Sequence, residues 1–231
     1  MKRTESEALL TDNGSDDGTS RFVSENFPWL RVQRNDNRTG YGGNHNLNLA
    51  RAAGRYIVIM NCDMTVTPNV LVALRDFMDG HADVGIVAPK ILNPDGTVQG
   101  LNRRSPTIAD LLLRRLSGAR VRRMFMRRMD RYEMRDVGYD CEYDVPCLSG
   151  CFMFCDSDLL RAVGGFDERY FLYFEDYDLC RRVQASRRTV YYPGATVTHY
   201  WERAAHKSVR HTGYFVASAF RYFNRWGYRI F

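Results

Sequence analysis

Residues 56–63 read Tyr56-Ile57-Val58-Ile59-Met60-Asn61-Cys62-Asp63, an apolar run that ends in a polar step. A continuous apolar run of this length is typical of a strand that is buried on both faces of a sheet. Helices must then cover both faces, so the run predicts an α/β fold. Ligands of open α/β sheets bind beyond the carboxyl ends of the strands, which is where Asn61 and Asp63 stand.

The segments around this strand alternate between strand and helix patterns. Predicted strands are Ala8–Thr11, Trp29–Gln33, Val84–Ala88, Val145–Cys155 and Thr189–Tyr192, and predicted helices are Leu47–Ala53, Pro68–Asp79, Leu159–Val163, Glu175–Ala185 and Tyr214–Phe223. Pro68 suits the first turn of its helix, and the glycines that follow Ala53 and Val163 suit helix ends. The alternation predicts a mostly parallel sheet flanked by helices.

Length and composition limit the class of protein. A chain of 231 residues, 45% of them hydrophobic, is expected to form one domain with a real core. Its net charge of +6 favours a polyanionic partner such as a nucleotide, a phospholipid, a phosphorylated carrier or nucleic acid. We find no apolar signal sequence and no run near the roughly 18 apolar residues of a membrane span, so we expect a cytoplasmic protein. The six cysteines lack C-x-x-C spacing, which argues against a structural zinc site.

The segment Arg103–Arg131 differs from the rest of the chain, because its ten arginines stand against only Asp110 and Asp130. Leucine and methionine residues are interleaved with the arginines at roughly helical spacing. One interpretation is a solvated basic helical face. The other is a surface that contacts the inner face of an anionic membrane, or a lipid-diphosphate acceptor. Aromatic stacking platforms are not interleaved with the arginines, so we expect no nucleic-acid partner.

Two polar clusters follow predicted strands. The first begins at Asp12, whose carboxylate can accept hydrogen bonds from a base or a ribose, although Asp, Asn, Gly and Ser are also the ordinary residues of a solvated turn. The second is Asn61-Cys62-Asp63. Its carboxylate and amide offer the oxygen ligands that a hard divalent cation prefers, although Asp63 can also cap the turn that follows.

A third cluster, Gly164–Cys180, surrounds carboxylates with aromatic residues. Apolar surroundings raise the pKa of a carboxylate toward the range of a general base. Asp176 and Asp178 also suit the start of a helix, but capping does not explain the aromatic residues. His199 follows the last predicted strand, and a lone histidine is more often structural than a ligand.

In this order and at this spacing, the clusters resemble glycosyltransferase family 2, which has the GT-A fold, and especially its rhamnosyltransferase-like branch. The matching stretches are Asp12-Asn13-Gly14-Ser15-x-Asp17-Gly18, Asn35-x-Asn37-x-x-Gly40-Tyr41-Gly42-Gly43-Asn44-x-Asn46, Ala53-Gly54-x-Tyr56 with Asn61-x-Asp63, Pro89-Lys90-Ile91-Leu92, Asp95-Gly96-Thr97 and Gly164–Cys180. Each stretch is weak alone, but the ordered set is specific and covers nearly the whole chain.

The resemblance implies a role for each matched residue on the donor side. Asp12 would contact the nucleotide base, and Asn13 and Asn44 would belong to the same donor-binding set. Asp63, with Asn61 nearby, would hold the donor diphosphate through Mg²⁺ or Mn²⁺. His199 resembles the histidine that completes the metal site in some relatives.

On the acceptor side, the resemblance implies that Asp176, in the pair with Glu175, is the base that deprotonates the acceptor hydroxyl. The implied reaction is inverting transfer of a sugar, rhamnose by the family branch, from a nucleotide-diphosphate donor to a glycan or a lipid-linked acceptor. Residues 1–100 would form the nucleotide-binding half of a single domain. Residues 101–231 would form the acceptor-binding half, with the basic helical insert 103–131 and a C-terminal helix.

Two alternatives stay open at this point. Family members usually carry a complete first strand and helix before the Asp12 motif, whereas only Met1–Leu10 precede it here, which favours a catalytically silent binding module on the same scaffold. The presence of both Asp63 and Asp176 favours an active enzyme. A metal-dependent nucleotidyltransferase would share the diphosphate cleft but would not need Asp176.

Overall fold

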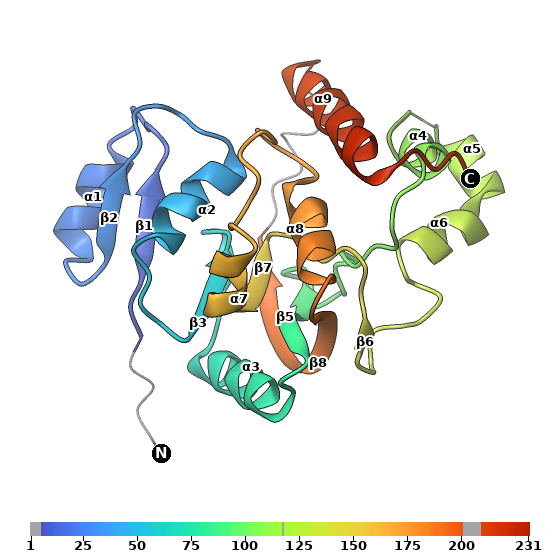
Figure 1. The fold of residues 1–231 in the computed structure, drawn as a ribbon. Helices are drawn as coiled ribbons and strands as arrows, with labels where there is room; N and C mark the ends of the chain where they lie inside the picture. The colour runs from blue at the N-terminus through green and yellow to red at the C-terminus, as the bar shows by residue number, and fades with distance from the viewer. Residues whose placement is uncertain (1–5, 117, 201–208) are drawn as a thin grey trace.

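The computed structural model describes residues 6–116, 118–200 and 209–231 as an α/β fold (Figure 1). In chain order the elements are β1 (Leu9–Asp12), α1 (Thr19–Asn26), β2 (Arg31–Arg34), α2 (Tyr41–Leu49), β3 (Tyr56–Met60), β4 (Met64–Thr65), α3 (Pro68–Gly80), β5 (Val84–Leu92), α4 (Ile108–Leu116), α5 (Ala119–Met124), α6 (Met126–Tyr132), β6 (Tyr143–Asp144), β7 (Phe152–Asp156), α7 (Ser157–Ala162), α8 (Glu175–Val183), β8 (Arg188–His199) and α9 (Val209–Trp226). Within these described residues, we find no helix that has both the length and the apolar character needed to cross a membrane.

The main sheet has the strand order β3-β7-β5-β8-β4, with β6 paired to β8. β5 and β8 are parallel, whereas β7 runs antiparallel to both of its neighbours, β3 and β5. The predicted α/β class with flanking helices is confirmed, but the sheet is mixed rather than mostly parallel, because β7 inserts between two strands from the first half of the chain. Residues 1–100 and 101–231 therefore share one sheet.

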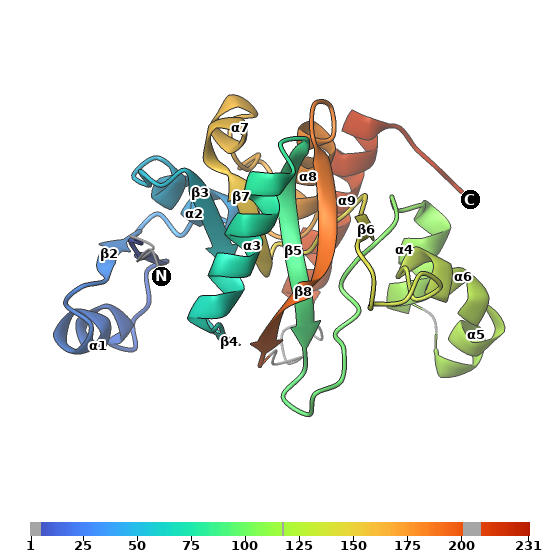
Figure 2. The same ribbon diagram turned by 90° about the horizontal axis from the view of Figure 1, so that it is seen from below.

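The apolar side chains of the sheet alternate between its two faces. Met153 and Cys155 on β7 pack in a cluster with residues of α7 and α8, while Phe152 and Phe154 pack in a cluster with residues of α3. Figure 2 shows α3 on one side of the sheet and α7 and α8 on the other. The run Tyr56–Met60 forms a strand as predicted, but β3 lies at the end of the described strand order, with Ile59 buried and Met60 exposed, so the prediction of burial on both faces was wrong.

β1 and β2 form a separate, parallel, two-stranded sheet. Helix α2 connects this sheet to the rest of the fold, and the hydroxyl of Thr11 on β1 donates to Asn48 Oδ1 on α2 at 3.0 Å. Figure 1 shows α2 between β1 and the main sheet. The polar residues after β1 therefore reach the main sheet through α2 rather than through strand pairing.

Helix α2 spans Tyr41–Leu49, so the bounds of the predicted helix Leu47–Ala53 were wrong. A Cβ atom on Gly40 would lie 2.2 Å from the backbone oxygen of Phe171, which leaves no space for a side chain. The N–H of Tyr41 donates to that same oxygen at 3.0 Å. The glycines thus let the first turn of α2 pack directly against the segment that precedes α8.

The basic segment 103–131 folds into α4, α5 and α6, as the predicted helical spacing required. A third apolar cluster joins α4 and α6 to α8 and α9, and its buried members include Leu111, Met129, Phe174 and Tyr222. The two ends of the basic segment are therefore anchored to the helix that carries Asp176.

Candidate active site

Asp63 and His199 lie side by side. Strand β4 pairs with the end of β8 in the register that aligns Met64 with His199. His199 Nε2 lies 3.2 Å from Asp63 Oδ1 and 3.4 Å from Asn61 Nδ2. His199 is buried, whereas the side chain of Asp63 is 41% exposed and accessible to a ligand. The structure thus brings together the three residues that the sequence assigned to the diphosphate and the metal.

Gln99 determines which ring nitrogen of His199 carries the proton. The Gln99 side-chain N–H donates to the backbone oxygen of His199 at 2.9 Å, so its Oε1 is left to accept from the ring Nδ1–H, also at 2.9 Å. The Nε2 lone pair is then directed toward Asp63. A lone pair and a carboxylate oxygen repel each other at 3.2 Å unless a proton or a cation lies between them.

A divalent cation fits this donor set. A carboxylate and a neutral imidazole are ligands that Mn²⁺ accepts, and Mg²⁺ is commonly held by one or two carboxylates together with substrate phosphates. Among the described residues, no group of three or more His, Cys, Asp or Glu side chains could hold a metal. Asp63 and His199 would therefore hold a cation only together with oxygens from a bound diphosphate.

Asp176 stands in the first turn of α8. Its Oδ2 accepts from the N–H of Gly150 at 3.1 Å, and its Oδ1 accepts from the N–H of Tyr177 at 2.9 Å. Burial raises the pKa of Asp176, while these backbone hydrogen bonds and the positive charge of Arg103 partly offset the rise. The side chain is half-buried, so its carboxylate combines raised basicity with access to a substrate.

Glu175 and Asp178, which flank Asp176, have different surroundings. Glu175 is 5% exposed, and its Oε2 has no hydrogen-bond partner among the described residues. Burial raises the pKa of Glu175 well above its ordinary value, and the charge of Asp176 raises it further, which favours the protonated form. Asp178 is fully buried and accepts from Arg182 at 2.7 Å and from Trp226 at 2.8 Å, so it anchors α8 to α9. Asp176 is thus the acid that is best placed to act as a base.

The backbone before α8 is strained. Tyr173 and Phe174 have φ angles of 71° and 66°, in the left-handed region that residues with side chains rarely adopt. Each such residue costs roughly 1–3 kcal/mol and needs surrounding contacts to hold it. The Phe174 ring provides these contacts, because its centroid lies 5.3 Å from the centroid of the Phe215 ring and 5.4 Å from that of the Tyr222 ring. The aromatic residues of Gly164–Cys180 therefore hold the turn that presents Asp176.

Tyr41 and Gly150 connect the two groups of residues. The Tyr41 hydroxyl lies 2.6 Å from the backbone oxygen of Gly150 and 3.2 Å from Asn61 Oδ1. The N–H of the same Gly150 donates to Asp176. A short chain of polar contacts thus joins Asn61 to Asp176, and the two groups belong to one site. Sequence reasoning missed Tyr41, Gln99 and Gly150 as parts of this site.

The other predicted donor residues lie at the end of β1 and the start of α2. Asp12 is buried, and its Oδ1 accepts from the N–H of Ser15 at 2.9 Å. The side-chain amides of Asn13 and Asn44 donate to the backbone oxygen of Thr39 at 3.0 and 3.3 Å. These contacts organise the turns after β1 and before α2. A contact with the nucleotide stays a prediction for all three residues.

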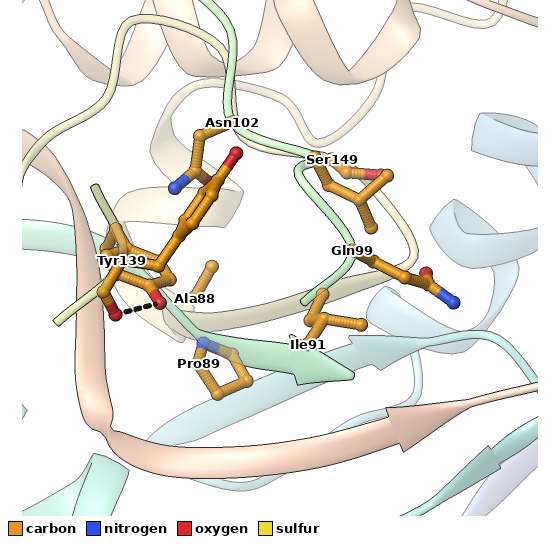
Figure 3. Close-up of a pocket in the computed structure, with 9 residues that line it drawn as sticks. Ala88, Pro89, Ile91, Gln99, Asn102, Tyr139 and Ser149 are labelled. Atoms are coloured by element: carbon orange, nitrogen blue, oxygen red, sulfur yellow. Dashed lines mark hydrogen bonds between the residues drawn. The ribbon is translucent and has the colours of Figure 1, made fainter. Parts of the chain in front are cut away.

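A small cavity lies behind the candidate metal site, between β5 and the segment that carries Gln99 and Asn102 (Figure 3). Tyr139 and Ser149 also line it. Its volume of about 10 Å³ is close to the minimum that holds one water molecule, so it is not a pocket for a nucleotide sugar. One of the residues that line the cavity, Gln99, contacts His199 of the candidate metal site.

A family model described as "Glycosyltransferase like family 2" matches residues 6–228. The chain belongs to glycosyltransferase family 2. This family 2 glycosyltransferase is 30% identical, over 236 residues, to the N-acetylglucosaminyl-diphospho-decaprenol L-rhamnosyltransferase of Mycobacterium tuberculosis, with 94% of this chain and 76% of that relative covered. The predicted family and the predicted enzyme class, a glycosyltransferase that uses a nucleotide sugar, are confirmed.

Solved GT-A glycosyltransferases share the fold of this family 2 chain. The mannosyltransferase PcManGT from Pyrobaculum calidifontis, in complex with GDP-Man and Mn²⁺, has a TM-score of 0.61 at 17% identity, covering 94% of this chain and 55% of that one. GalNAc-T7 with UDP, GalNAc and Mn²⁺ has a TM-score of 0.61 at 15% identity, and the match covers 86% of this chain and 38% of GalNAc-T7. S. aureus TarS 1–349 with UDP has a TM-score of 0.55 at 16% identity, covering 94% and 56%. The family 2 chain therefore spans between 38% and 56% of the length of these structures.

Proposed function

We propose that this family 2 glycosyltransferase transfers a sugar with inversion from a nucleoside-diphosphate donor, with Asp176 as the base and with Mg²⁺ or Mn²⁺ held at Asp63 and His199. The observation that carries the proposal is the half-buried carboxylate of Asp176, which polar contacts through Gly150 and Tyr41 connect to the Asp63 side of the site. A binding module alone would have no need of a reachable carboxylate with a raised pKa at this position.

The reaction is a single displacement. Asp176 takes the proton of the acceptor hydroxyl while the hydroxyl oxygen forms a bond to C1 of the donor sugar. The bond between C1 and the diphosphate oxygen breaks on the opposite face, and its electron pair leaves with the diphosphate, so the configuration at C1 inverts. A bound cation supplies positive charge that stabilises the leaving diphosphate. Gln99 keeps Nε2 of His199 turned toward that side of the site.

The donor sugar and the acceptor that we propose are taken from the name of the Mycobacterium tuberculosis relative. That protein is named for L-rhamnose as the sugar and for N-acetylglucosaminyl-diphospho-decaprenol as the acceptor. We extend both to this chain as classes: a nucleotide-activated rhamnose as donor, and a sugar linked through a diphosphate to a lipid as acceptor. The reaction would then belong to the synthesis of a cell-wall or related polysaccharide.

The helices of the basic segment support a peripheral contact with an anionic membrane. Large apolar side chains are exposed where α5 meets α6 and at the C-terminus; Met124, Phe125, Met126, Ile230 and Phe231 make up this apolar rim. Met124 is 80% and Phe231 88% exposed, and the Arg128 guanidinium of α6 lies over the Phe231 ring. A purely solvated basic face would not gather such side chains, whereas arginines around an apolar rim suit an anionic bilayer surface.

The proposed reaction can be tested with a panel of nucleotide sugars in the presence and absence of Mn²⁺. We expect one donor to raise the melting temperature only when Mn²⁺ is present, and slow release of a nucleoside diphosphate from the same donor. Failure of every donor in both measurements would support the silent binding module. Release of pyrophosphate instead would support nucleotidyl transfer.

A further inference from the structure

A cluster of arginines lies within electrostatic reach of Asp176. Glu133 is the centre of this cluster. Arg103 and Arg114 approach the same oxygen, Oε1, at 3.5 Å each, and Arg135 lies 2.6 Å from Oε2. Three guanidinium groups thus face the carboxylates of Glu133 and of Asp130, which lies 3.7 Å from Arg135, so the cluster carries one excess positive charge.

Arg103 forms the buried part of this cluster. Its side chain is 5% exposed, and its Nη1 donates to the backbone oxygens of Gly100 and Asn102 at 2.7 Å. Its Nε is buried without a hydrogen-bond partner among the described residues. A buried cation is costly unless anions lie nearby, and among the described residues the ion partner of Arg103 is Glu133 alone, at 3.5 Å. The site therefore favours a further negative charge.

Arg114 forms the accessible part of the cluster. It extends from α4, and its side chain is 36% exposed, whereas Arg135, which is more exposed at 56%, is paired with Glu133 at 2.6 Å. In the described part of the chain its one ion partner is Glu133, at a distance longer than an ordinary hydrogen bond. Most of its N–H groups are thus available to a phosphate, which guanidinium groups bind in a bidentate manner.

The position of the cluster identifies the molecule that would supply the anion. Gly150 and Tyr41 connect Asp176 to Asn61, and Arg103 of the arginine cluster acts electrostatically on Asp176. The donor diphosphate belongs on the Asn61 side. An anion at the arginine cluster would therefore belong to the acceptor, whose hydroxyl must reach Asp176.

We propose that Arg114, supported by Arg103, binds the diphosphate of a lipid-linked sugar acceptor while the sugar hydroxyl lies at Asp176. This inference rests on the proposed function and adds the residues that recognise the acceptor. The order of the elements suits such a molecule: the sugar meets the start of α8, the diphosphate meets α4, and the lipid meets the apolar rim beyond it (Figure 1).

A binding measurement tests the anion site without requiring turnover. The probe is citronellyl diphosphate, a short prenyl diphosphate, titrated in EDTA so that no cation engages Asp63 and His199. We expect Arg114→Gln to weaken binding about tenfold or more, because the charge-assisted contact is lost. Arg114→Lys should weaken binding less, because lysine keeps the charge but not the bidentate geometry. Arg21→Gln is the control, because Arg21 is 84% exposed on α1, far from the cluster, and should bind as the wild type does.

A kinetic measurement separates this inference from the proposed function. The acceptors are N-acetylglucosaminyl citronellyl diphosphate and the octyl glycoside of the same sugar, which has no phosphate. We expect Arg114→Gln to raise KM for the diphosphate acceptor alone, with KM for the donor unchanged. If the wild type transfers sugar but the variant treats both acceptors as the wild type does, and still binds the probe, then the cluster only holds α4 against α6. If the wild type neither hydrolyses nor transfers any donor sugar, the proposed function fails, while the probe titration still decides whether the anion site exists.

Discussion

His199 Nε2 lies 3.2 Å from Asp63 Oδ1, although the two residues come from the last strand of the main sheet and from the loop after β3. The antiparallel pairing of β4 with the end of β8 produces this contact. Because Gln99 places the ring proton on the opposite nitrogen, two electron-rich atoms face each other. In the proposed function, this pair would share a cation with the donor diphosphate.

Asp63→Ala removes the only carboxylate of this pair. We expect the variant to lose Mn²⁺-dependent donor binding while it keeps its melting temperature within about 2–4 °C of the wild type, because Asp63 is partly exposed and lies outside the core. Calorimetric titration of donor with and without Mn²⁺ measures this. Asp158→Ala, which removes a carboxylate that is 98% exposed on α7, is the control. Equal Mn²⁺ dependence in both variants would remove Asp63 from the metal site.

Gln99→Leu tests the orientation of His199. Without the amide, the imidazole loses the partner that holds its proton on Nδ1, and we expect the apparent affinity for Mn²⁺ in the presence of donor to fall about 10–100-fold. Donor binding in EDTA should not change. The measurement is the Mn²⁺ concentration that gives half-maximal thermal stabilisation. An unchanged midpoint would mean that Gln99 only fills space behind the site.

The parts of the fold that the sequence predicted well depend on local patterns. The strand Tyr56–Met60 is apolar at every position, and the helix at Pro68 starts with a residue that suits a first turn, so both follow from residues close in sequence. The start of α2 at Tyr41 does not follow from residues close in sequence, because it is stabilised by contacts of Gly40 and Tyr41 with the distant segment around Phe171. The antiparallel direction of β7 is likewise a property of topology, which no local pattern encodes.

The site follows the same division. Asp63 and Asp176 stand in recognisable motifs, so the sequence could propose them as site residues, and the resemblance added His199; their roles stay predictions. Gln99 and Tyr41 act through partners 100 and 109 positions away along the chain, and neither has a local signal of function. Contacts of this kind become visible only once the strands are paired.

The apolar rim and the arginines beside it predict binding to anionic vesicles. We expect the double variant Arg123→Gln, Arg127→Gln to reduce co-sedimentation with phosphatidylglycerol vesicles, since each arginine near such a surface contributes about 1 kcal/mol. Binding to neutral phosphatidylcholine vesicles should be weak for all variants. Arg21→Gln with Arg51→Gln, which removes two charges from α1 and the end of α2, is the matched control. If both double variants lose the same amount of binding, net charge rather than this surface explains it.

Glu175→Gln should change how stability depends on pH. Burial raises the pKa of Glu175 in the folded state well above its value in the unfolded chain. The folded protein therefore holds this proton more tightly, and its stability falls as the pH rises from the unfolded pKa, near 4.5, toward the raised folded pKa. Glutamine does not titrate, so the melting temperature of the variant should exceed that of the wild type by a margin that grows over this range. Glu25→Gln, on the exposed surface of α1, should show no such trend, and parallel curves for Glu175→Gln would contradict the assignment.

Asp176→Asn removes the proposed base and keeps the shape of the side chain. We expect turnover to fall by about 10²–10⁴-fold, the usual contribution of a general base, while donor affinity measured with Mn²⁺ changes little. The measurement is release of nucleoside diphosphate in the presence of acceptor, together with donor titration. A variant that keeps most of its turnover would show that another group accepts the proton.

The pH profile separates Asp176 from its neighbour. Because burial raises the pKa of Asp176, the wild type should lose activity as the pH falls through a value above the ordinary range of aspartate, since the protonated acid accepts no proton. The residual activity of Asp176→Asn should lack this acidic limb, whereas Glu175→Gln should keep it at about the same pH, because burial and the charge of Asp176 keep Glu175 protonated while Asp176 titrates. An acidic limb that persists in Asp176→Asn and disappears in Glu175→Gln would assign the base to Glu175 instead.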